Sequence, residues 1–328
     1  MTSPASVRAR AALVVAAALI APAAAGQLIT RVSGPVIGYV WYSQQHQLRP
    51  LQGVLGSATV GDPVDLGVEI SDALELGPSR LLLTSSGPAL LAVDLSTDPP
   101  SVGRVAGASF VPALATSSRG GSAAALYDRA TRTIAIVTGL PESPRVAHRV
   151  GVLQLNAPVT TMAVSDDGST LVYAVSGGEL ASLFSWNPTS GVRALVDTSA
   201  VSALALLAGN GVAVANPRDN EVFLVSGLGG STRRRTLAGP GQGISNPVGL
   251  AAASNGARIH VANGGSSNVT TFEVTGRLVG NRRCNCEISG LKLVGESLYR
   301  LTGQLDRTLF LFDARSAESR ILFVPPVG

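Results

Sequence analysis

Histidine is the first residue type to consider for catalysis or metal binding in this sequence. His46, His148 and His260 lie far apart in the chain, without the short spacings typical of zinc sites. His260 falls in the middle of "RIHVAN", a strand-like stretch, which favours a packed side chain over a ligand. No G-x-S-x-G, H-E-x-x-H or phosphate-binding G-K-S/T pattern is present. The sequence therefore predicts no cofactor and gives a divalent metal no recognisable ligand set.

The two cysteines are a second chemical candidate, because Cys284 and Cys286 are separated by one residue in "CNC". On an extended strand both thiols project to the same face, but their Cα atoms are then about 6.5–7 Å apart, at the limit of disulfide geometry. A turn would bring them closer and make a disulfide easy. Three states remain open, namely a disulfide, two free structural thiols, and a redox or metal-binding pair.

Five arginines are a third candidate, in the segments "STRRRTL" and "GNRRC". Both segments are expected on outer strands of neighbouring repeat units, where charged side chains protect a sheet edge from aggregation. The alternative is a basic rim patch that meets an anionic partner such as a cell-wall polymer or lipid headgroups. The residues concerned are Arg233, Arg234, Arg235, Arg282 and Arg283.

The overall charge gives little reason to expect nucleic acid as a partner. The chain of 328 residues has a formal net charge of +4. Two of its 25 bases, Arg8 and Arg10, lie in the first 25 residues, so 23 bases remain against 21 acids, a net charge of +2. That charge is too small for strong binding to a polyanion. The 45% hydrophobic and 14% charged residues are typical of a globular protein.

The N-terminus has the order of a secretory signal peptide. A basic start, "MTSPASVRAR", precedes the apolar run "AALVVAAALIA", and small residues follow at Ala23 and Ala25. We therefore predict a signal peptide at residues 1–25, a mature domain at residues 26–328, and a secreted or periplasmic location. The apolar run is shorter than the roughly 20 residues that span a bilayer, so an uncleaved anchor is the less favoured alternative. The Ala- and Arg-rich composition favours a bacterial source.

A strand–turn–strand unit recurs along the chain. The units are 42 to 49 residues apart, which suits one four-stranded propeller blade each. Within a unit, runs rich in Val, Leu and Ile are separated by Gly, Asn, Asp and Ser, the residues of hairpin turns. The sequence predicts an all-β fold with four-stranded antiparallel blades. The six units begin near Val68, Phe110, Val159, Val201, Pro247 and Leu291.

A seventh blade is predicted from the N-terminal strands. Turns of the type expected between third and fourth strands occur seven times, and the first, "YSQQHQ", belongs to a hairpin at residues 36–54. We expect this hairpin to close the ring against the C-terminal unit, because closure removes open strand edges. A six-bladed ring with an extra N-terminal hairpin is the alternative.

The second strand of each unit ends in a polar residue. Such residues favour turns, because their short side chains bond the nearby backbone. A second interpretation places them on one face of the ring, where they frame the mouth of the central channel and bind a ligand. The six residues are Thr84, Asp128, Ser176, Asn216, Asn263 and Thr302, and the candidates for ligand binding are Asp128, Ser176, Asn216 and Asn263.

Two segments carry a family resemblance. "NPVGLAAASNGARIHVANGGSSNVTTFEV", Asn246 to Val274, and "APVTTMAVSDDGSTLVYAVSGGELASLFSWNPTSG", Ala157 to Gly191, resemble YVTN-type and lactonase-like propeller repeats. The "SDDG" and "NPTSG" turns match that pattern well, and the other units match it weakly. The resemblance implies a propeller fold. Some lactonase-like propellers hold a metal in the central channel, but no motif transfers those ligands to this sequence; Asp128, Asn216 and Asn263 are only compatible with such a site.

Three functions are compatible with these patterns. The favoured one is an exported, non-catalytic propeller that binds a protein, a glycan or an envelope component over one face, as a monomer without a transmembrane span. The second is a lactonase-like hydrolase with a metal in the channel. The third is a redox accessory protein that uses the two cysteines. A propeller fold by itself does not choose between them.

Overall fold

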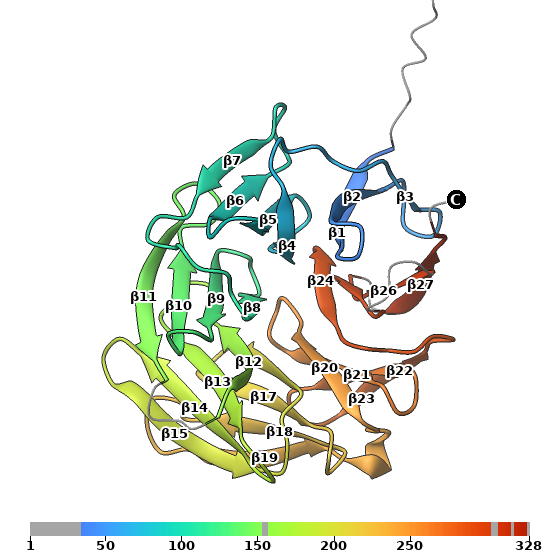
Figure 1. Cartoon of the computed structure of the whole chain (residues 1–328). Coiled ribbons are helices and arrows are strands. Elements are labelled where there is room, and N and C mark those ends of the chain that lie inside the picture. The colour runs from blue at the N-terminus through green and yellow to red at the C-terminus, as the bar shows by residue number, and fades with distance from the viewer. Residues whose placement is uncertain (1–33, 153–156, 303–307, 316–317, 327–328) are drawn as a thin grey trace, which may run out of the picture. The chain divides into compact units, whose positions relative to one another are not determined.

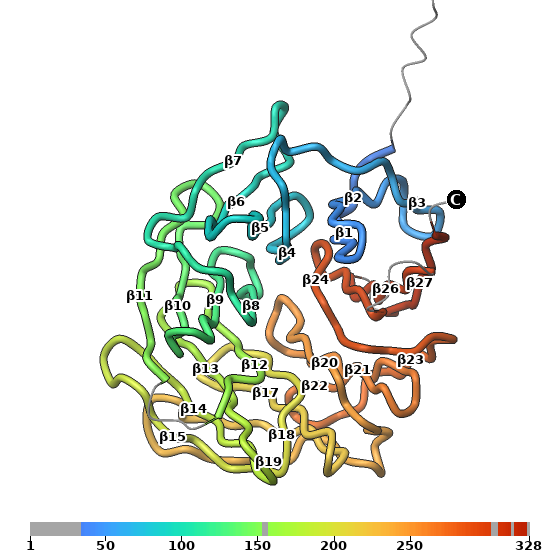
Figure 2. The backbone as a smooth tube through the Cα atoms, viewed as in Figure 1, coloured from blue at the N-terminus to red at the C-terminus, as the bar shows by residue number. Residues whose placement is uncertain are grey.

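The computed structural model describes residues 34–152, 157–302, 308–315 and 318–326. Its strands form seven separate sheets, each built from consecutive strands of the chain. The sheets follow one another around a ring, from the blue strand β1 to the red strand β27 (Figure 1 and Figure 2). We number the sheets as blades 1 to 7 in chain order. The predicted signal peptide, residues 1–25, lies outside the described residues.

Blades 2 to 7 each contain four antiparallel strands that pair in chain order, from the innermost strand at the axis to the outermost. The predicted all-β, seven-bladed propeller is therefore confirmed. The strands are β4 (Ile70–Glu75), β5 (Arg80–Ser85), β6 (Leu90–Asp94) and β7 (Ser101–Arg104) in blade 2; β8 (Leu114–Ser117), β9 (Ala123–Asp128), β10 (Thr133–Thr138) and β11 (Arg145–Gly151) in blade 3; β12 (Val159–Val164), β13 (Leu171–Ser176), β14 (Ala181–Asn187) and β15 (Gly191–Thr198) in blade 4; β16 (Ala203–Leu207), β17 (Gly211–Asn216), β18 (Glu221–Ser226) and β19 (Arg233–Ala238) in blade 5; β20 (Pro247–Ala252), β21 (Arg258–Asn263), β22 (Asn268–Glu273) and β23 (Leu278–Arg283) in blade 6; and β24 (Lys292–Gly295), β25 (Leu298–Arg300), β26 (Leu309–Asp313) and β27 (Arg320–Val324) in blade 7.

Blade 1 has three strands, β1 (Val36–Tyr42), β2 (Gln47–Gln52) and the short β3 (Thr59–Val60). Strand β1 lies innermost, beside β24 of blade 7 and β4 of blade 2. The "YSQQHQ" turn therefore joins a first strand to a second strand, and its predicted place between third and fourth strands was wrong. Turn residues mark where the chain reverses, but they do not show which two strands of a blade the reversal joins.

The position of a strand in its blade explains its sequence pattern. Second and third strands lie between two neighbouring blades, so both of their faces are covered; β9 and β17 are buried at every residue. Their sequences, AAALYD and GVAVAN, are accordingly almost continuous apolar runs. The outermost strand β11, RVAHRVG, has one covered face, and its exposed residues alternate with residues that are partly or fully buried.

The hydrophobic core is divided into seven clusters, one at each junction between neighbouring blades. The cluster between blades 7 and 1 is built like the others, with Val40 and Leu51 of blade 1 against Val294 and Leu311 of blade 7. Blade 7 therefore meets blade 1 through packed side chains. No strand is shared between the two blades among the described residues.

Glycines permit the close approach of β1 and β24 at this junction. A Cβ atom on Gly38 would lie 2.6 Å from the carbonyl oxygen of Val294, and one on Gly295 would lie 2.7 Å from the carbonyl oxygen of Ile37. These are distances that real Cβ contacts essentially never show. The two inner strands can therefore lie side by side only because both positions lack a side chain.

Helical structure is nearly absent from the described residues, where the one helical element is the 3-10 turn η1 (Pro240–Gln242). In this part of the chain, no helix has the length and apolar character that crossing a membrane requires.

Candidate functional site

The four predicted ligand-binding residues all lie at the ends of second strands, at the last residue of β9, β13, β17 and β21. Because every blade has the same strand order, these ends share one face of the ring. None of the four side chains lines the central cavity. The second strand is one step removed from the axis, and the ends of β9, β13, β17 and β21 lie outside the cavity lining.

The polar groups of these residues are used locally. Asn216 is fully buried; its Nδ2 donates to Thr198 Oγ1 at 2.9 Å and to Asp219 Oδ2 at 2.7 Å, and its Oδ1 accepts from the Arg218 backbone N at 3.1 Å. Asn263 Nδ2 donates to Asn268 Oδ1 at 2.8 Å. The geometry is that of turn-forming residues, and the ligand role of the four stays a prediction.

Asp128 follows the same local pattern. Asp128 Oδ1 accepts from the Ala130 backbone N at 2.9 Å, and its Oδ2 accepts from Thr131 Oγ1 at 2.7 Å. Ser176 differs, because the half-buried residue is held through its backbone N, which donates to Pro158 O at 3.4 Å. The other two predicted strand-end residues are close to their expected places: Thr84 lies one residue before the end of β5, and Thr302 two residues beyond the end of β25.

The substitution Asn216→Ala is expected to lower the free energy of unfolding by about 1–2 kcal/mol, because buried partners lose their hydrogen bonds. Chemical denaturation measures this change. Asn255→Ala is the matched control, since Asn255 is an exposed turn residue with one hydrogen bond, to the Ala257 backbone N. Equal stability of the two variants would contradict the structural role of Asn216.

The predicted arginines lie on the outer strands of neighbouring blades, Arg233–Arg235 on β19 and Arg282–Arg283 on β23. Several of the side chains are engaged. Arg235 donates to the carbonyl oxygen of Val274 in blade 6, and Arg282 donates to that of Ser319 in blade 7. Each contact joins an outer strand to the turn before the outer strand of the next blade. Arg193 of blade 4 makes the same type of contact with Gly230 O at 2.8 Å.

These contacts give the rim arginines a role between blades that the sequence did not suggest. Arg234 remains within its own blade, where it pairs with Glu221 and lies 4.1 Å from the centroid of the Phe223 ring. Arg233 and Arg283 are exposed. The anionic partner predicted for this surface stays a prediction.

Cys284 and Cys286 form a disulfide in the structure. The segment has left strand β23 and bends, and its Cα atoms are 5.1 Å apart, shorter than an extended chain would give. Cys284 is buried in the cluster between blades 6 and 7. The sequence left three states of the two cysteines open, and the structure contains the disulfide, which requires a bend in the chain.

His260 is a core residue. Its side chain is 4% exposed, its Nδ1 lies 2.9 Å from Thr271 Oγ1, and its ring meets Phe312 at a centroid distance of 5.1 Å. Burial lowers the pKa of His260 to about 4, and Arg258 adds to the shift. Within the described ranges, no three His, Cys, Asp or Glu side chains are grouped closely enough to hold a metal ion.

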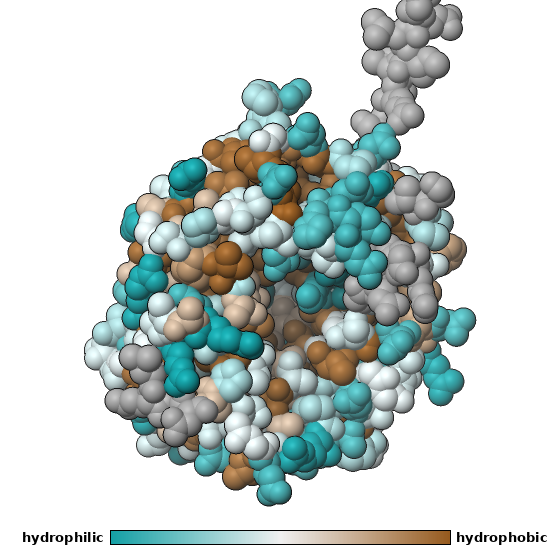
Figure 3. Space-filling view, viewed as in Figure 1, coloured by the Kyte–Doolittle hydropathy of each residue, from teal (hydrophilic) through white to brown (hydrophobic). Residues whose placement is uncertain are grey.

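A cavity with a volume of about 710 Å³ lies on the axis of the ring. The inner strands of all seven blades contribute to its lining. Figure 3 shows a hollow at the centre of the molecule, with hydrophobic and hydrophilic residues at its rim. Leucines of blades 2, 5, 6 and 7 form apolar walls: Leu74, Leu204, Leu206, Leu250 and Leu293.

Two charged residues of the channel lining are buried. Glu75, at the end of β4, is 6% exposed, and Arg300, at the end of β25, is 8% exposed. Glu75 Oε1, Arg300 Nη1 and the indole Nε1 of Trp41 have no hydrogen-bond partner, and all three residues line the cavity. Buried polar atoms are nearly always paired in folded proteins, so three on one lining mark a candidate site.

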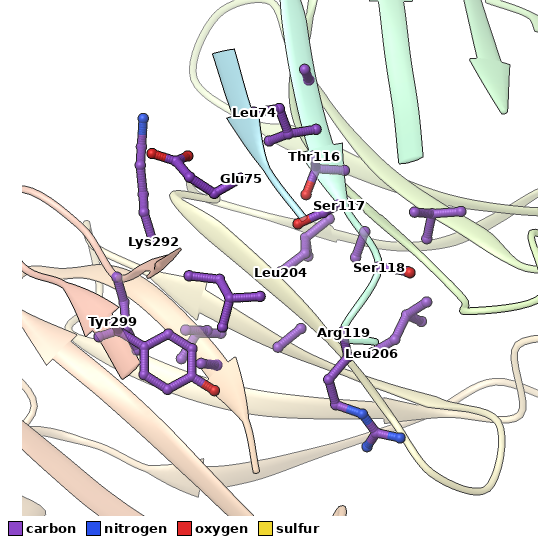
Figure 4. A pocket seen from close by; sticks show the side chains of 18 of the residues that line it. Leu74, Glu75, Thr116, Ser117, Ser118, Arg119, Leu204, Leu206, Lys292 and Tyr299 are labelled. Carbon is purple, nitrogen blue, oxygen red and sulfur yellow. The ribbon is translucent and has the colours of Figure 1, made fainter. Parts of the chain in front are cut away.

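The charges of the site act on one another. Burial raises the pKa of Glu75, and the positive charges of Arg300 and then Lys292 counter that shift. In Figure 4 the side chains of Glu75 and Lys292 extend into the same part of the cavity. Lys292 is exposed, so a group that enters the channel meets it in addition to the buried pair.

Arg119 occupies another part of the channel. It is exposed in the turn between β8 and β9 of blade 3, and its Nη1 donates to the carbonyl oxygen of Ala253 in blade 6 at 3.5 Å. Figure 4 shows Arg119 at the lower right of the view, away from Lys292 at the upper left. Burial raises the pKa of Tyr299 to about 12, and the charge of Arg119 acts in the opposite direction.

None of the sequence patterns identified Glu75, Arg300 or Trp41 as candidate site residues. A signal was present, because Glu75 ends the strand "ISDALE" and Arg300 interrupts the apolar stretch "SLYRL". A charged residue in such a stretch is informative only when its burial is known.

Comparisons with known proteins agree on the architecture. A functionally unknown protein from Desulfotomaculum acetoxidans DSM 771 has a similar structure, with a TM-score of 0.60 and 14% sequence identity over 89% of this chain and 100% of that one. The chain is a seven-bladed β-propeller. The structure of U3-55K is also similar, with a TM-score of 0.52 and 15% identity over 81% of this chain and 84% of that one. At such identities the likeness shows the fold alone.

No protein-family model matches the sequence, and no curated protein matches it significantly. The resemblance to YVTN-type and lactonase-like repeats therefore stays an interpretation of individual segments.

Proposed function

We propose that this propeller is a binding protein that takes a small polar molecule into its central channel. The observation that carries the proposal is the cavity of about 710 Å³, in which buried Glu75, Arg300 and Trp41 each hold an unpaired polar atom. Ligand sites are concave and mostly apolar, with a few polar groups that fix the orientation of the ligand. The channel combines leucine walls with such polar groups, and strands β1, β4 and β25 hold Trp41, Glu75 and Arg300 in place.

The proposal includes export from the cytoplasm, because the first 25 residues have the order of a signal peptide. The intact mass of the mature protein tests it: a species that begins after Ala25 is expected, and a mature fraction that retains Met1 would contradict export by this signal. The wider partners predicted from the sequence, a protein, a glycan or an envelope component bound over one face, remain compatible with a channel ligand.

Filling the channel tests the binding function. A library of polar metabolites is first screened for compounds that raise the melting temperature of the wild-type protein. These compounds are expected not to raise the melting temperature of the Leu206→Trp variant. The half-buried Leu206 lines the cavity, so the larger ring occupies the space of a ligand (Figure 4). Val192→Trp is the matched control, because Val192 is 44% exposed on outer strand β15.

Two outcomes contradict the proposal. One is a library in which no compound stabilises the wild-type protein. The other is a set of stabilising compounds that act equally on Leu206→Trp, which would place their site elsewhere.

The lactonase-like alternative uses the same channel but requires a metal ion. Its test is metal analysis of the purified protein, together with lactone hydrolysis measured with and without a chelator. Chelator-sensitive hydrolysis by the wild-type protein would favour this alternative over a binding function.

A further inference from the structure

Buried polar atoms without partners are concentrated on the channel lining. The described residues contain four such side-chain atoms, and three of them belong to residues that line the cavity: Trp41 Nε1, Glu75 Oε1 and Arg300 Nη1. The fourth, the hydroxyl of Tyr173, lies in the core between blades 3 and 4. Leaving such atoms unpaired is unfavourable, so their common position indicates that a molecule in the channel completes them.

The three atoms require different partners. A carboxylate oxygen of Glu75 accepts hydrogen bonds, whereas the guanidinium of Arg300 and the indole of Trp41 only donate them. Glu75 Oε1 and Arg300 Nη1 are both unpaired, so these two atoms are not bonded to each other. Arg300 is nevertheless the foremost charge acting on Glu75. The cavity lining thus offers a free acceptor on Glu75 and a free donor on Arg300.

The balance of charges at the site restricts the class of ligand further. Glu75 and Arg300 carry opposite charges, and the exposed residues that act on Glu75 add one of each sign, Lys292 and Asp72. The site is therefore neutral as a whole. A ligand that pairs both buried charges without disturbing this balance carries one anionic and one cationic group of its own.

We propose that the channel binds a free α-amino acid with a large apolar side chain. The carboxylate accepts hydrogen bonds from Arg300 and Trp41, and the ammonium group donates to Glu75. The side chain lies against the leucine walls, to which Leu204 and Leu206 of blade 5 contribute. This inference rests on the proposed function and names the ligand class of the same site.

A ligand series on the wild-type protein tests the inference without any substitution. Calorimetric titration compares L-phenylalanine with L-phenylalaninamide, which lacks the carboxylate, and with 3-phenylpropionate, which lacks the ammonium group. L-Phenylalanine is expected to bind about tenfold or more tightly than either analogue, because each analogue leaves one buried charge unpaired.

Two variants test which group of the ligand each buried residue binds. Glu75→Gln is expected to weaken L-phenylalanine and the amide but not 3-phenylpropionate, and Arg300→Gln to weaken L-phenylalanine and 3-phenylpropionate but not the amide. Glu296→Gln is the matched control, because Glu296 is an exposed acid outside the cavity lining. Equal weakening of all three compounds by both variants would indicate structural damage and overturn the assignment.

The outcomes separate this inference from the proposed function. Binding of a neutral sugar such as glucose, lost in Leu206→Trp, together with no binding of L-phenylalanine, would overturn the amino-acid inference and retain the channel as a binding site. Binding of L-phenylalanine that persists in Leu206→Trp would contradict both. Analogues that bind as tightly as L-phenylalanine would show that the buried pair does not recognise a zwitterion.

Discussion

The substitution Gly38→Val is expected to lower the free energy of unfolding by about 3 kcal/mol, because overpacking forces the backbone apart. A Cβ atom at this position would meet the carbonyl oxygen of Val294 at 2.6 Å and the Val294 Cγ1 atom at 2.8 Å. The nearest neighbour is backbone, which cannot rotate away. Strands β1 and β24 would have to separate, at the junction where the first and last blades meet.

Gly103→Val on the outer strand β7 is the matched control. A Cβ atom on Gly103 meets no other atom within 4 Å, so the same change of residue adds bulk without a clash. Denaturant unfolding of both variants isolates the effect of close approach. A Gly38→Val protein that is as stable as the Gly103→Val protein would show that the close approach of β1 and β24 does not require glycine at position 38.

Acid is expected to destabilise the protein through His260. Burial lowers the pKa of this imidazole to about 4, from its ordinary value of 6.5. The unfolded chain therefore takes up a proton as the pH falls below 6.5, and the folded protein does so only near pH 4. Stability is highest above pH 6.5 and declines as the pH falls towards 4, with a total loss of about 3 kcal/mol.

The variant His260→Gln is expected to lack this decline, because glutamine does not titrate. Its stability at neutral pH is lower, since the contacts with Thr271 and Phe312 change, but the difference from wild type narrows as the pH falls. His46→Asn, which removes an exposed imidazole in a turn with a positive φ of 52°, controls for the loss of a histidine as such. Parallel pH profiles of wild type and His260→Gln would contradict the assignment of the acid sensitivity to His260.

Local sequence patterns were sufficient to predict the architecture. Turn residues such as those of "SDDG" and "NPTSG" act over a few positions, and strand runs are short, so their repetition every 42 to 49 residues indicated four-stranded blades. The same local chemistry explains why Asn216 and Asn263 were recognised as turn-forming residues. Their hydrogen bonds reach mostly to residues close in the chain or in the adjoining strand.

The N-terminal blade was harder to interpret, because turn residues show where two strands are joined but not which position each strand takes in its blade. The "YSQQHQ" turn was therefore assigned to the wrong pair of strands. For Cys284 and Cys286, the sequence left the disulfide open because only the backbone path decides the distance between their Cα atoms. The bend after β23 made that distance 5.1 Å.

By itself the sequence thus determined the kind of unit, its repetition and the turns that end its strands, because these depend on neighbours in the chain. Only the tertiary structure decided where the candidate site lies. Trp41, Glu75 and Arg300 come from blades 1, 2 and 7, and they share one cavity because the ring brings the first and last blades together. Their charges and hydrogen-bonding groups mark a candidate site because they are buried. Burial depends on the assembled ring rather than on any single segment of the sequence.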